Sequence, residues 1–177
     1  MLQIAMLSFA HVHANGYARQ VNENPDTALT CIWDDDPVRG QEAAERYNVP
    51  FVEDMSAVLE DDEIDGVVVN SETSKHKLIF LAAAEAGKHI FTEKTLTITT
   101  ADAEDVVKAI HESGVEFMIS LPSRSRPETL FMKRVLDEGL IGDVTLMRAR
   151  VAHSAALDRW FTPERHNAWF GDPELAG

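Results

Sequence analysis

Short apolar runs alternate with amphipathic segments along the first two thirds of the chain. The apolar runs are nearly continuous, which is typical of strands in a parallel sheet that helices cover on both faces. They predict strands over 2–8, 28–33, 65–69, 88–93 and 115–120. The amphipathic segments predict helices over 15–23, 41–47, 55–60, 74–86 and 100–113. Because the two kinds of element alternate, we predict an α/β fold with a doubly wound parallel sheet and right-handed crossovers.

Glycines and a capping residue mark the ends of the later helices. Gly87 and Gly114 each follow a predicted helix, at the position where a left-handed residue commonly ends it. Thr100 is a candidate N-cap. A further helix is expected over 127–138, and residues 143–152 then alternate like an antiparallel strand. This change of pattern predicts that a second domain begins near the end of the chain.

The charge balance narrows the range of partners. Asp and Glu number 30 against 16 for Lys and Arg, giving a formal net charge of −14. Such a surface repels phosphate backbones and anionic membranes, so we expect neither a nucleic-acid nor a membrane partner. The N-terminus lacks signal-peptide features, and the single cysteine, Cys31, cannot form an intrachain disulfide. These features predict a cytoplasmic protein.

A Glu-Lys pair follows the predicted strand over 88–93. Open α/β sheets hold their ligands at the carboxyl ends of the strands. Lys94 placed there can polarise a substrate hydroxyl or exchange a proton with it, with Glu93 tuning its charge. The alternative is a surface ion pair at the end of a strand.

The turn after the first strand occupies the position where a dinucleotide fold holds pyrophosphate. The usual loop reads Gly-x-Gly-x-x-Gly, and here Ser8, Ala10 and His13 stand at the glycine positions. Ser8 and Ala10 are small enough for fairly close approach, whereas His13 would keep the helix further from the sheet. Helix-end amides can still receive an anion without glycine. The loop residues assigned to cofactor contact are Ser8, Phe9, Ala10, His11 and Val12.

The two histidines of this loop raise the question of a metal. His11 and His13 lie two residues apart, with no carboxylate or cysteine near them in sequence. Zinc needs three or four ligands. We therefore predict no metal site and interpret the histidines as phosphate or substrate contacts, or as surface residues.

Two further strand ends carry candidate cofactor contacts. Asp34 ends the second strand and can accept hydrogen bonds from the adenosine ribose, whereas a 2′-phosphate would be repelled by it and by Asp35, so NAD is favoured over NADP. The alternative is an acidic turn before Pro37. After the strand predicted over 65–69, polar side chains could line the nicotinamide side of the cleft, and Thr73 or Ser74 could also cap the next helix. The residues assigned here are Ser71, Glu72, Thr73 and His76.

Five motifs in order resemble the glucose-fructose oxidoreductase / inositol dehydrogenase / MocA family. Glu93-Lys94-Thr95-Leu96 is similar to the family's Glu-Lys-Pro motif, with Thr95 in place of proline. The other motifs are Asp34-x-Asp36-Pro37, Ala86-Gly87-Lys88-His89, Gly139-Leu140-Ile141-Gly142 and the approach from Trp169-Phe170 to Gly177. The replaced proline often follows a cis peptide bond, which costs about 2.5–4 kcal/mol before a residue other than proline.

The resemblance implies a Rossmann fold and NAD(P)-dependent hydride transfer to or from a hydroxyl of a sugar, polyol or related compound. It implies that Lys94 assists at the reacting hydroxyl, that Glu93 lies near the nicotinamide ribose and that Arg124 lies beside the cofactor cleft. It further implies a dinucleotide-binding domain over 1–122. Residues 123–177 would then be a crossover helix and the truncated start of an α/β substrate domain.

Three functional hypotheses follow from this resemblance. The family's catalytic Asp and His lie beyond residue 177, so we expect the 177-residue chain alone to be inactive and its partner to be a small-molecule substrate, with a homo-oligomer allowed. The first hypothesis is the cofactor domain of a dehydrogenase. The second is a non-catalytic nucleotide- or partner-binding module that lacks the catalytic domain. The third keeps NAD but uses transient oxidation to assist elimination or hydrolysis.

Overall fold

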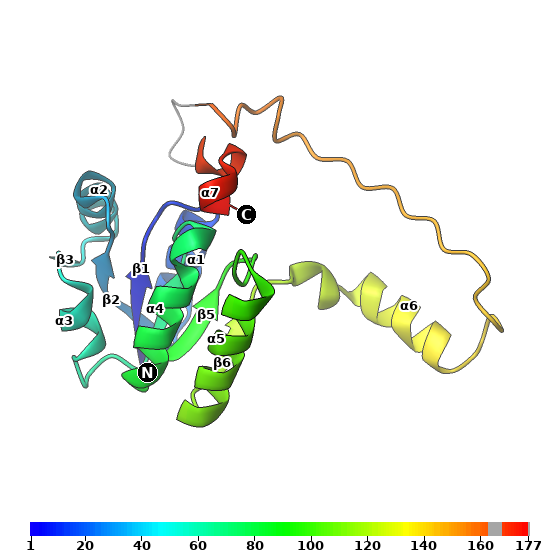
Figure 1. The fold of residues 1–177 in the computed structure, drawn as a ribbon, viewed down its shortest axis with the longest axis horizontal. Coiled ribbons are helices and arrows are strands. Elements are labelled where there is room, and N and C mark those ends of the chain that lie inside the picture. The colour runs from blue at the N-terminus through cyan, green and yellow to red at the C-terminus, as the bar shows by residue number, and fades with distance from the viewer. Residues whose placement is uncertain (163–167, 177) are drawn as a thin grey trace.

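Six parallel strands form one sheet in the order β3-β2-β1-β4-β5-β6 (Figure 1). The structure is a computed structural model that describes residues 1–162 and 168–176. The prediction of a doubly wound parallel sheet is confirmed, with β3 as a short strand that the pattern missed. The strands are β1 (Leu2–Leu7), β2 (Thr27–Trp33), β3 (Phe51–Val52), β4 (Gly66–Val69), β5 (His89–Thr92) and β6 (Phe117–Ile119).

Helices cover both faces of this sheet. Two helices pack on one face and three on the other, so the central strands are buried on both sides. Within the described ranges, no helix is long and apolar enough to cross a membrane. The first face carries α1 (Ala14–Glu23) and α2 (Pro37–Tyr47), and the second carries α3 (Met55–Leu59), α4 (Thr73–Glu85) and α5 (Thr100–Ser113).

The core follows the two-residue period of the central strands. Leu7 and Val69 point toward α4 and pack with Phe80, which is fully buried. Met6 and Val68 point to the opposite face, toward α1 and α2. Since successive side chains of a strand face opposite sides, apolar residues at every position fill both layers of the core. This packing fixes the carboxyl ends of β1 and β4 relative to each other.

The structure corrects the predicted helix caps. The N-cap of α5 is Thr99, whose Oγ1 accepts a hydrogen bond from the Asp102 amide at 3.1 Å. The N-cap of α4 is Glu72, without a side-chain cap bond. The predicted caps Thr100, Thr73 and Ser74 are therefore wrong, because a capping side chain comes from the non-helical residue that precedes the helix and these three are already helical.

The region after β6 extends away from the sheet before it returns. The predicted helix forms as α6 (Pro127–Asp137) and projects outward (Figure 1). The strand predicted over 143–152 is wrong: this segment is irregular and exposed, because no strand in the described part of the chain lies beside it to accept its backbone hydrogen bonds. The remaining elements are η1 (Pro122–Arg124), η2 (Ala168–Gly171) and α7 (Pro173–Ala176), of which α7 contacts α4.

Candidate functional site

The carboxyl ends of β1 and β4 lie where the strand order of the sheet reverses, and we call the region above them the crevice. Open α/β sheets bind ligands at this topological switch point. One wall is the loop over 8–13, which follows β1, and the other is the segment over 70–72, which follows β4. The His11 amide donates to the Asn70 carbonyl at 2.9 Å and joins the two walls. The Glu93-Lys94 turn after β5 lies beside them.

Ser8 takes the conformation that the first glycine of such a loop usually supplies. Its φ is 72°, in the left-handed region that non-glycine residues rarely adopt. Its hydroxyl lies 3.3 Å from Asp34 Oδ1 and accepts a hydrogen bond from the Ala10 amide at 3.2 Å. These bonds offset the unfavourable backbone conformation, so the tight turn forms without glycine.

The amides of this loop are largely engaged within the protein. The Phe9 amide donates to Asp34 Oδ2 at 2.7 Å, and the Ala10 amide donates to the Ser8 hydroxyl. The His11 and His13 amides donate to the Asn70 carbonyl and to His11 Nδ1. A glycine-rich loop presents such amides to phosphate. Here the side chains must supply most of the polar contacts with a bound anion.

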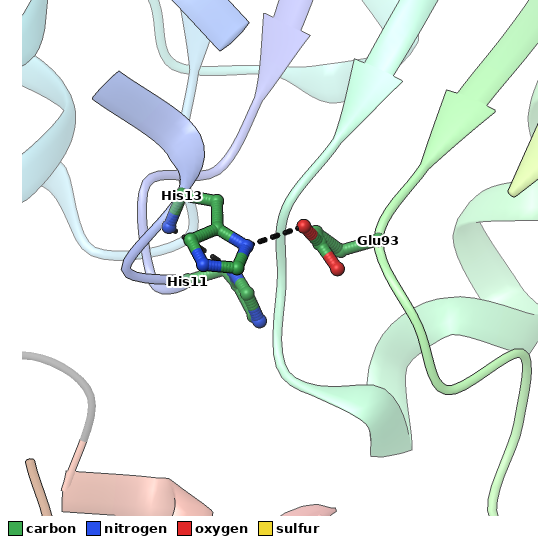
Figure 2. A group of neighbouring side chains, drawn as sticks. All are labelled: His11, His13 and Glu93. Carbon is green, nitrogen blue, oxygen red and sulfur yellow. Dashed lines mark hydrogen bonds and ion pairs between the residues drawn. The ribbon is translucent and has the colours of Figure 1, made fainter. Parts of the chain in front are cut away.

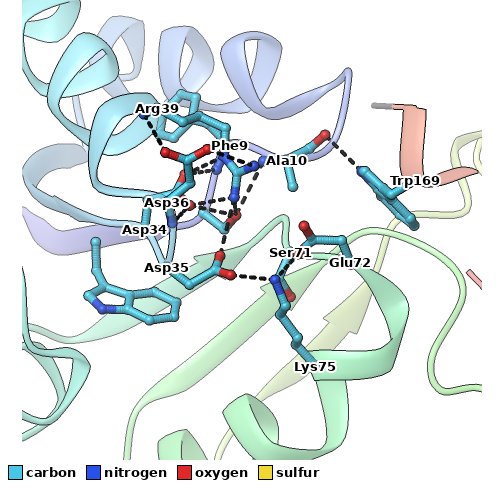
Figure 3. Close-up of polar contacts among 12 residues, drawn as sticks. Phe9, Ala10, Asp34, Asp35, Asp36, Arg39, Ser71, Glu72, Lys75 and Trp169 are labelled. Atoms are coloured by element: carbon cyan, nitrogen blue, oxygen red, sulfur yellow. Dashed lines mark hydrogen bonds and ion pairs between the residues drawn. The ribbon is translucent and has the colours of Figure 1, made fainter. Parts of the chain in front are cut away.

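Asp34 lies at the predicted end of β2, but its carboxylate faces the protein interior (Figure 3). The side chain is fully buried and forms an ion pair with Arg39, with Arg39 Nε 2.9 Å from Asp34 Oδ2. The Phe9 and Asp36 amides also donate to it. A carboxylate offers about four lone-pair sites, so these bonds saturate Asp34. Part of the acidic-turn alternative also holds, because Asp36 caps α2.

A chain of ion pairs continues from Arg39 across the outer mouth of the crevice. Arg39 Nη2 lies 3.2 Å from Asp35 Oδ1, and Asp35 pairs with Lys75. Lys75 Nζ also lies 2.7 Å from Glu72 Oε2. Although burial by itself raises the pKa of Asp35, its bond and ion pair with Lys75 outweigh this and lower that pKa. The network ties the end of β2 to the start of α4. Within it the Asp35 carboxylate is more exposed than that of Asp34.

Three buried polar atoms in the crevice lack a partner among the described residues. They are His11 Nε2, Asn70 Oδ1 and Ser71 Oγ. Burial lowers the pKa of His11 to about 4, with Lys94 and His13 adding to this and Glu93 opposing it, so the imidazole is neutral at pH 7. Leaving buried polar groups unpaired is costly, and such groups often mark a place for a ligand. Hydroxyl, amide and phosphate groups of a dinucleotide match their hydrogen-bonding capacity.

Glu93 is buried at the carboxyl end of β5 and faces the first loop (Figure 2). Its Oε1 accepts a hydrogen bond from Tyr17 and lies 2.6 Å from His13 Nδ1. Tyr17 in turn bonds to Ser120 Oγ at 2.7 Å. Although burial by itself raises the pKa of Glu93, the bonds with Tyr17 and His13 outweigh this and lower it. The surface ion pair considered for Glu93 and Lys94 is not what forms.

Lys94 is exposed, and its ammonium makes no ion pair with any described residue. The Lys94–Thr95 peptide bond is cis. His76 braces this turn from α4, because its Nδ1 lies 2.8 Å from the Thr95 carbonyl and its Nε2 lies 3.2 Å from the Ser71 carbonyl. His76 therefore has a structural role, because it holds both the Thr95 and the Ser71 segments in place.

The other predicted residues divide between core, crevice and outer groove. The Phe9 ring packs in the core under α2, with Tyr47 6.0 Å away. Thr73 is buried at the start of α4. Val12 and the exposed Arg124 line a groove of about 800 Å³ between α1 and β6. The crevice itself brings together Ala10, His11, Ser71, Glu72, Glu93 and Lys94.

Several residues of the site were missed by sequence reasoning. Arg39 and Tyr17 carried no motif, and their roles depend on partners far along the chain. Asn70 begins the polar segment predicted to line the cleft, but it was not among the assigned residues. Trp169 is buried over the crevice, and its Nε1 donates to the Ala10 carbonyl at 3.1 Å (Figure 3). In the sequence Trp169 belonged only to a motif of the resemblance, and its contact with the first loop could not be read from it.

Comparison with curated proteins gives relatives with related activities. The chain is 32% identical over 133 residues to scyllo-inositol 2-dehydrogenase (NAD(+)) of Bacillus subtilis, covering 75% of this chain and 38% of the relative. It is 28% identical over 142 residues to levoglucosan dehydrogenase of Pseudarthrobacter phenanthrenivorans, covering 80% and 35%. It is also 28% identical over 127 residues to 2,7-anhydro-N-acetylneuraminate hydratase of Escherichia coli, covering 72% and 34%. The chain thus spans less than half the length of these relatives.

Solved structures and a family model agree with this grouping. A 3-ketoreductase from Actinomadura kijaniata in complex with NADP and TDP-benzene is similar at a TM-score of 0.70 and 27% identity, covering 80% of this chain and 44% of that one. Apo scyllo-inositol dehydrogenase from Lactobacillus casei matches in fold, with a TM-score of 0.74 and 22% identity over 82% and 44%. The model of the oxidoreductase family with an NAD-binding Rossmann fold matches residues 8–121. The chain therefore belongs to this Gfo/Idh/MocA oxidoreductase family.

Proposed function

We propose that the chain is the cofactor-binding part of an NAD(P)-dependent oxidoreductase that transfers hydride between nicotinamide and a hydroxyl of a sugar, polyol or related compound. The observation that carries this proposal is the convergence of buried, unpaired polar atoms at the switch point of the sheet: His11 Nε2, Asn70 Oδ1 and Ser71 Oγ. The exposed Lys94 ammonium lies beside them. The dehydrogenases among the relatives support the reaction class.

The charges around the outer mouth of the crevice favour NAD over NADP. Asp35, Asp36 and Glu72 surround this mouth together with the buried Asp34, against the cations of Arg39 and Lys75. A 2′-phosphate would add charge to this acidic surface. Since Asp34 is saturated, we assign the ribose hydroxyls to Asp35. The proposed role of Asp34 is to hold the first loop and Arg39 in place.

When bound, the nicotinamide supplies the hydride acceptor or donor, and the residues of this chain orient the reactants and move the proton. Lys94 Nζ is the proposed partner of the reacting hydroxyl: as an ammonium it donates a hydrogen bond to the hydroxyl oxygen, and only as the neutral amine can it take the hydroxyl proton. Glu93 is fixed by Tyr17 and His13, so it holds the turn that presents Lys94. His76 holds the same turn through the Thr95 carbonyl. The proposed substrate class is taken from the names of the relatives and not from this chain, which matches only 38% and 35% of their lengths.

A second candidate function has support from one relative. The hydratase of Escherichia coli matches over most of this chain, which favours the hypothesis that transient oxidation assists an elimination or addition of water. In that case turnover of substrate would leave no net NADH. A non-catalytic nucleotide-binding module remains the alternative if cofactor binds and Lys94 proves dispensable. A homo-oligomer and a cytoplasmic location stay predictions.

Titration with NADH, followed by the fluorescence of the bound nucleotide, tests the proposal. We expect saturable binding that Ser71→Ala weakens by about two- to tenfold, because one hydrogen bond contributes about 0.5–1.5 kcal/mol. Ser74→Ala is the matched control, since Ser74 is exposed on α4 and should leave the affinity unchanged. In a full-length protein that carries the substrate domain, Lys94→Ala should preserve NADH binding and abolish turnover. Absence of binding at millimolar NADH would refute the cofactor role.

A further inference from the structure

Three side chains with metal-ligating atoms converge at the floor of the crevice. His11, His13 and Glu93 each place one such atom within 4.8 Å of the other two (Figure 2). Glu93 is 80 residues from His13 in sequence. The fold brings them together because β1 and β5 flank β4, so that their carboxyl ends meet at one edge of the sheet.

The Glu93 carboxylate is buried without a lysine or arginine partner in the described part of the chain. Its side chain is 3% exposed. Its hydrogen bonds come from Tyr17, from the Lys94 amide at 3.0 Å and from the His13 ring. A buried carboxylate is stabilised far more by a cation than by neutral donors. A metal ion between Glu93 and the two imidazoles would supply that charge.

His11 adds an independent observation that points to a ligand. The residue is 3% exposed, and its Nε2 has no hydrogen-bond partner among the described residues. Its Nδ1 accepts a hydrogen bond from the His13 amide at 3.2 Å. Coordination through Nε2 would move the ring proton to Nδ1, so the His13 amide would lose this long bond and would have to turn away from a second N–H group. The orphaned nitrogen then gains a partner.

We propose that His11, His13 and Glu93 form a binding site for a divalent first-row transition ion of the Zn²⁺ type. Two imidazoles and one carboxylate are a ligand set that such ions accept, with at least one position left open. Zinc bonds of about 2.0–2.2 Å place tetrahedral ligands about 3.4 Å apart, so the site closes by rotation of His13, whose side chain is half exposed. Tyr17 is bonded to Glu93 and to Ser120, and it holds the carboxylate from behind.

Three protein ligands would leave at least one position of the ion open for a further ligand. Because the loop amides are engaged within the protein, a cation here would offer an anionic ligand the positive charge that those amides do not. This role toward a cofactor phosphate rests on the proposed function. The binding of the ion itself does not, so the two can be tested separately.

Calorimetric titration of the chelator-treated chain with ZnCl₂, without nucleotide, tests the site. We expect one ion per chain with micromolar affinity or tighter, and at least tenfold weaker binding for His13→Gln and Glu93→Gln. The control is His111→Gln, an exposed histidine of α5 that should not change the affinity. His13→Gln is the primary variant because its half-exposed side chain tolerates change, and circular dichroism checks that each variant is folded.

Each result of the zinc titration supports or overturns the proposed metal site. Absence of zinc binding overturns the site, as does wild-type affinity in the folded His13→Gln and Glu93→Gln variants or an equal loss in His111→Gln. Zinc binding by the wild type that both variants weaken supports it, whether or not NADH binds. If NADH binds and zinc does not, the metal site fails while the proposed function stands.

Discussion

The buried ion pair between Asp34 and Arg39 should be among the most sensitive points of the fold. Its side chains are 0% and 9% exposed, and Arg39 also bonds to the Ser8 hydroxyl at 3.2 Å. Arg39→Met would leave the Asp34 carboxylate buried without a cation. Breaking such a pair costs about 3–5 kcal/mol. The amides of Phe9 and Asp36 still donate to the carboxylate, so we expect the lower end, about 3 kcal/mol.

Urea unfolding at pH 7, followed by circular dichroism, measures this loss as a free energy, and thermal unfolding measures it as a fall in Tm. For a chain of this length each kcal/mol lowers Tm by about 2–4 °C, so the expected fall is about 6–12 °C. Lys133→Met is the control, because Lys133 pairs with Asp137 on α6 with side chains 70% and 59% exposed, and such a pair contributes at most about 0.5 kcal/mol.

A double variant separates the effect of charge from that of packing. Asp34→Asn combined with Arg39→Met leaves no charge buried, so its loss of stability should be smaller than the sum of the two single losses. A loss below about 1 kcal/mol for Arg39→Met, or additive losses in the double variant, would refute the view that this pair is buried and energetically coupled.

Three further perturbations test the packing and the buried groups. Gly40→Ala should destabilise the chain by about 1–3 kcal/mol, because the added methyl would lie 2.3 Å from the Phe51 ring. The matched Gly16→Ala meets nothing within 4 Å and should be neutral or stabilising. Thermal unfolding that finds Gly16→Ala the less stable of the two would contradict this packing. Burial lowers the pKa of His76, so the unfolded chain takes up a proton first as pH falls, and stability should be lost below about pH 6.5. Urea unfolding from pH 7.5 to 5 should show that the free energy of unfolding falls less steeply with pH in His76→Asn than in the unchanged chain. Equal pH dependence in both would contradict this role of His76. Burial, reinforced by the charge of Asp61, raises the pKa of Cys31 to about 11. Iodoacetamide at pH 8 should therefore alkylate the thiol of the folded chain far more slowly than that of the urea-unfolded chain. Equal alkylation rates would show that the Cys31 thiol is accessible in the folded chain.

The sequence predicted best those elements whose signals are local. The helix predicted over 100–113 forms with those bounds, since Gly114 ends it at a φ of 72°. The strand predicted over 143–152 did not form, because alternation gives a segment one apolar face but no neighbouring strand. β3 was missed because two residues, Phe51 and Val52, are too few to establish a period.

The candidate site was predicted by position and missed in its contacts. The strand-end rule located Asp34, Ser71 and Glu93 at one edge of the sheet. It could not reveal that Arg39, in the first turn of the next helix, folds back to neutralise Asp34. Nor could it place Glu93 beside His13, because that contact depends on strand order rather than on spacing along the chain. The prediction of no metal site rested on the absence of a carboxylate near His11 and His13 in sequence, whereas the fold brings Glu93 beside them.

Hydrogen–deuterium exchange with and without saturating NADH tests most directly whether the crevice above β1 and β4 is the dinucleotide site. The account predicts slower exchange over 8–14 and 70–76, which include its two walls, and unchanged exchange over α5. Unchanged exchange in both wall segments at millimolar NADH, or protection confined to α5, would contradict it.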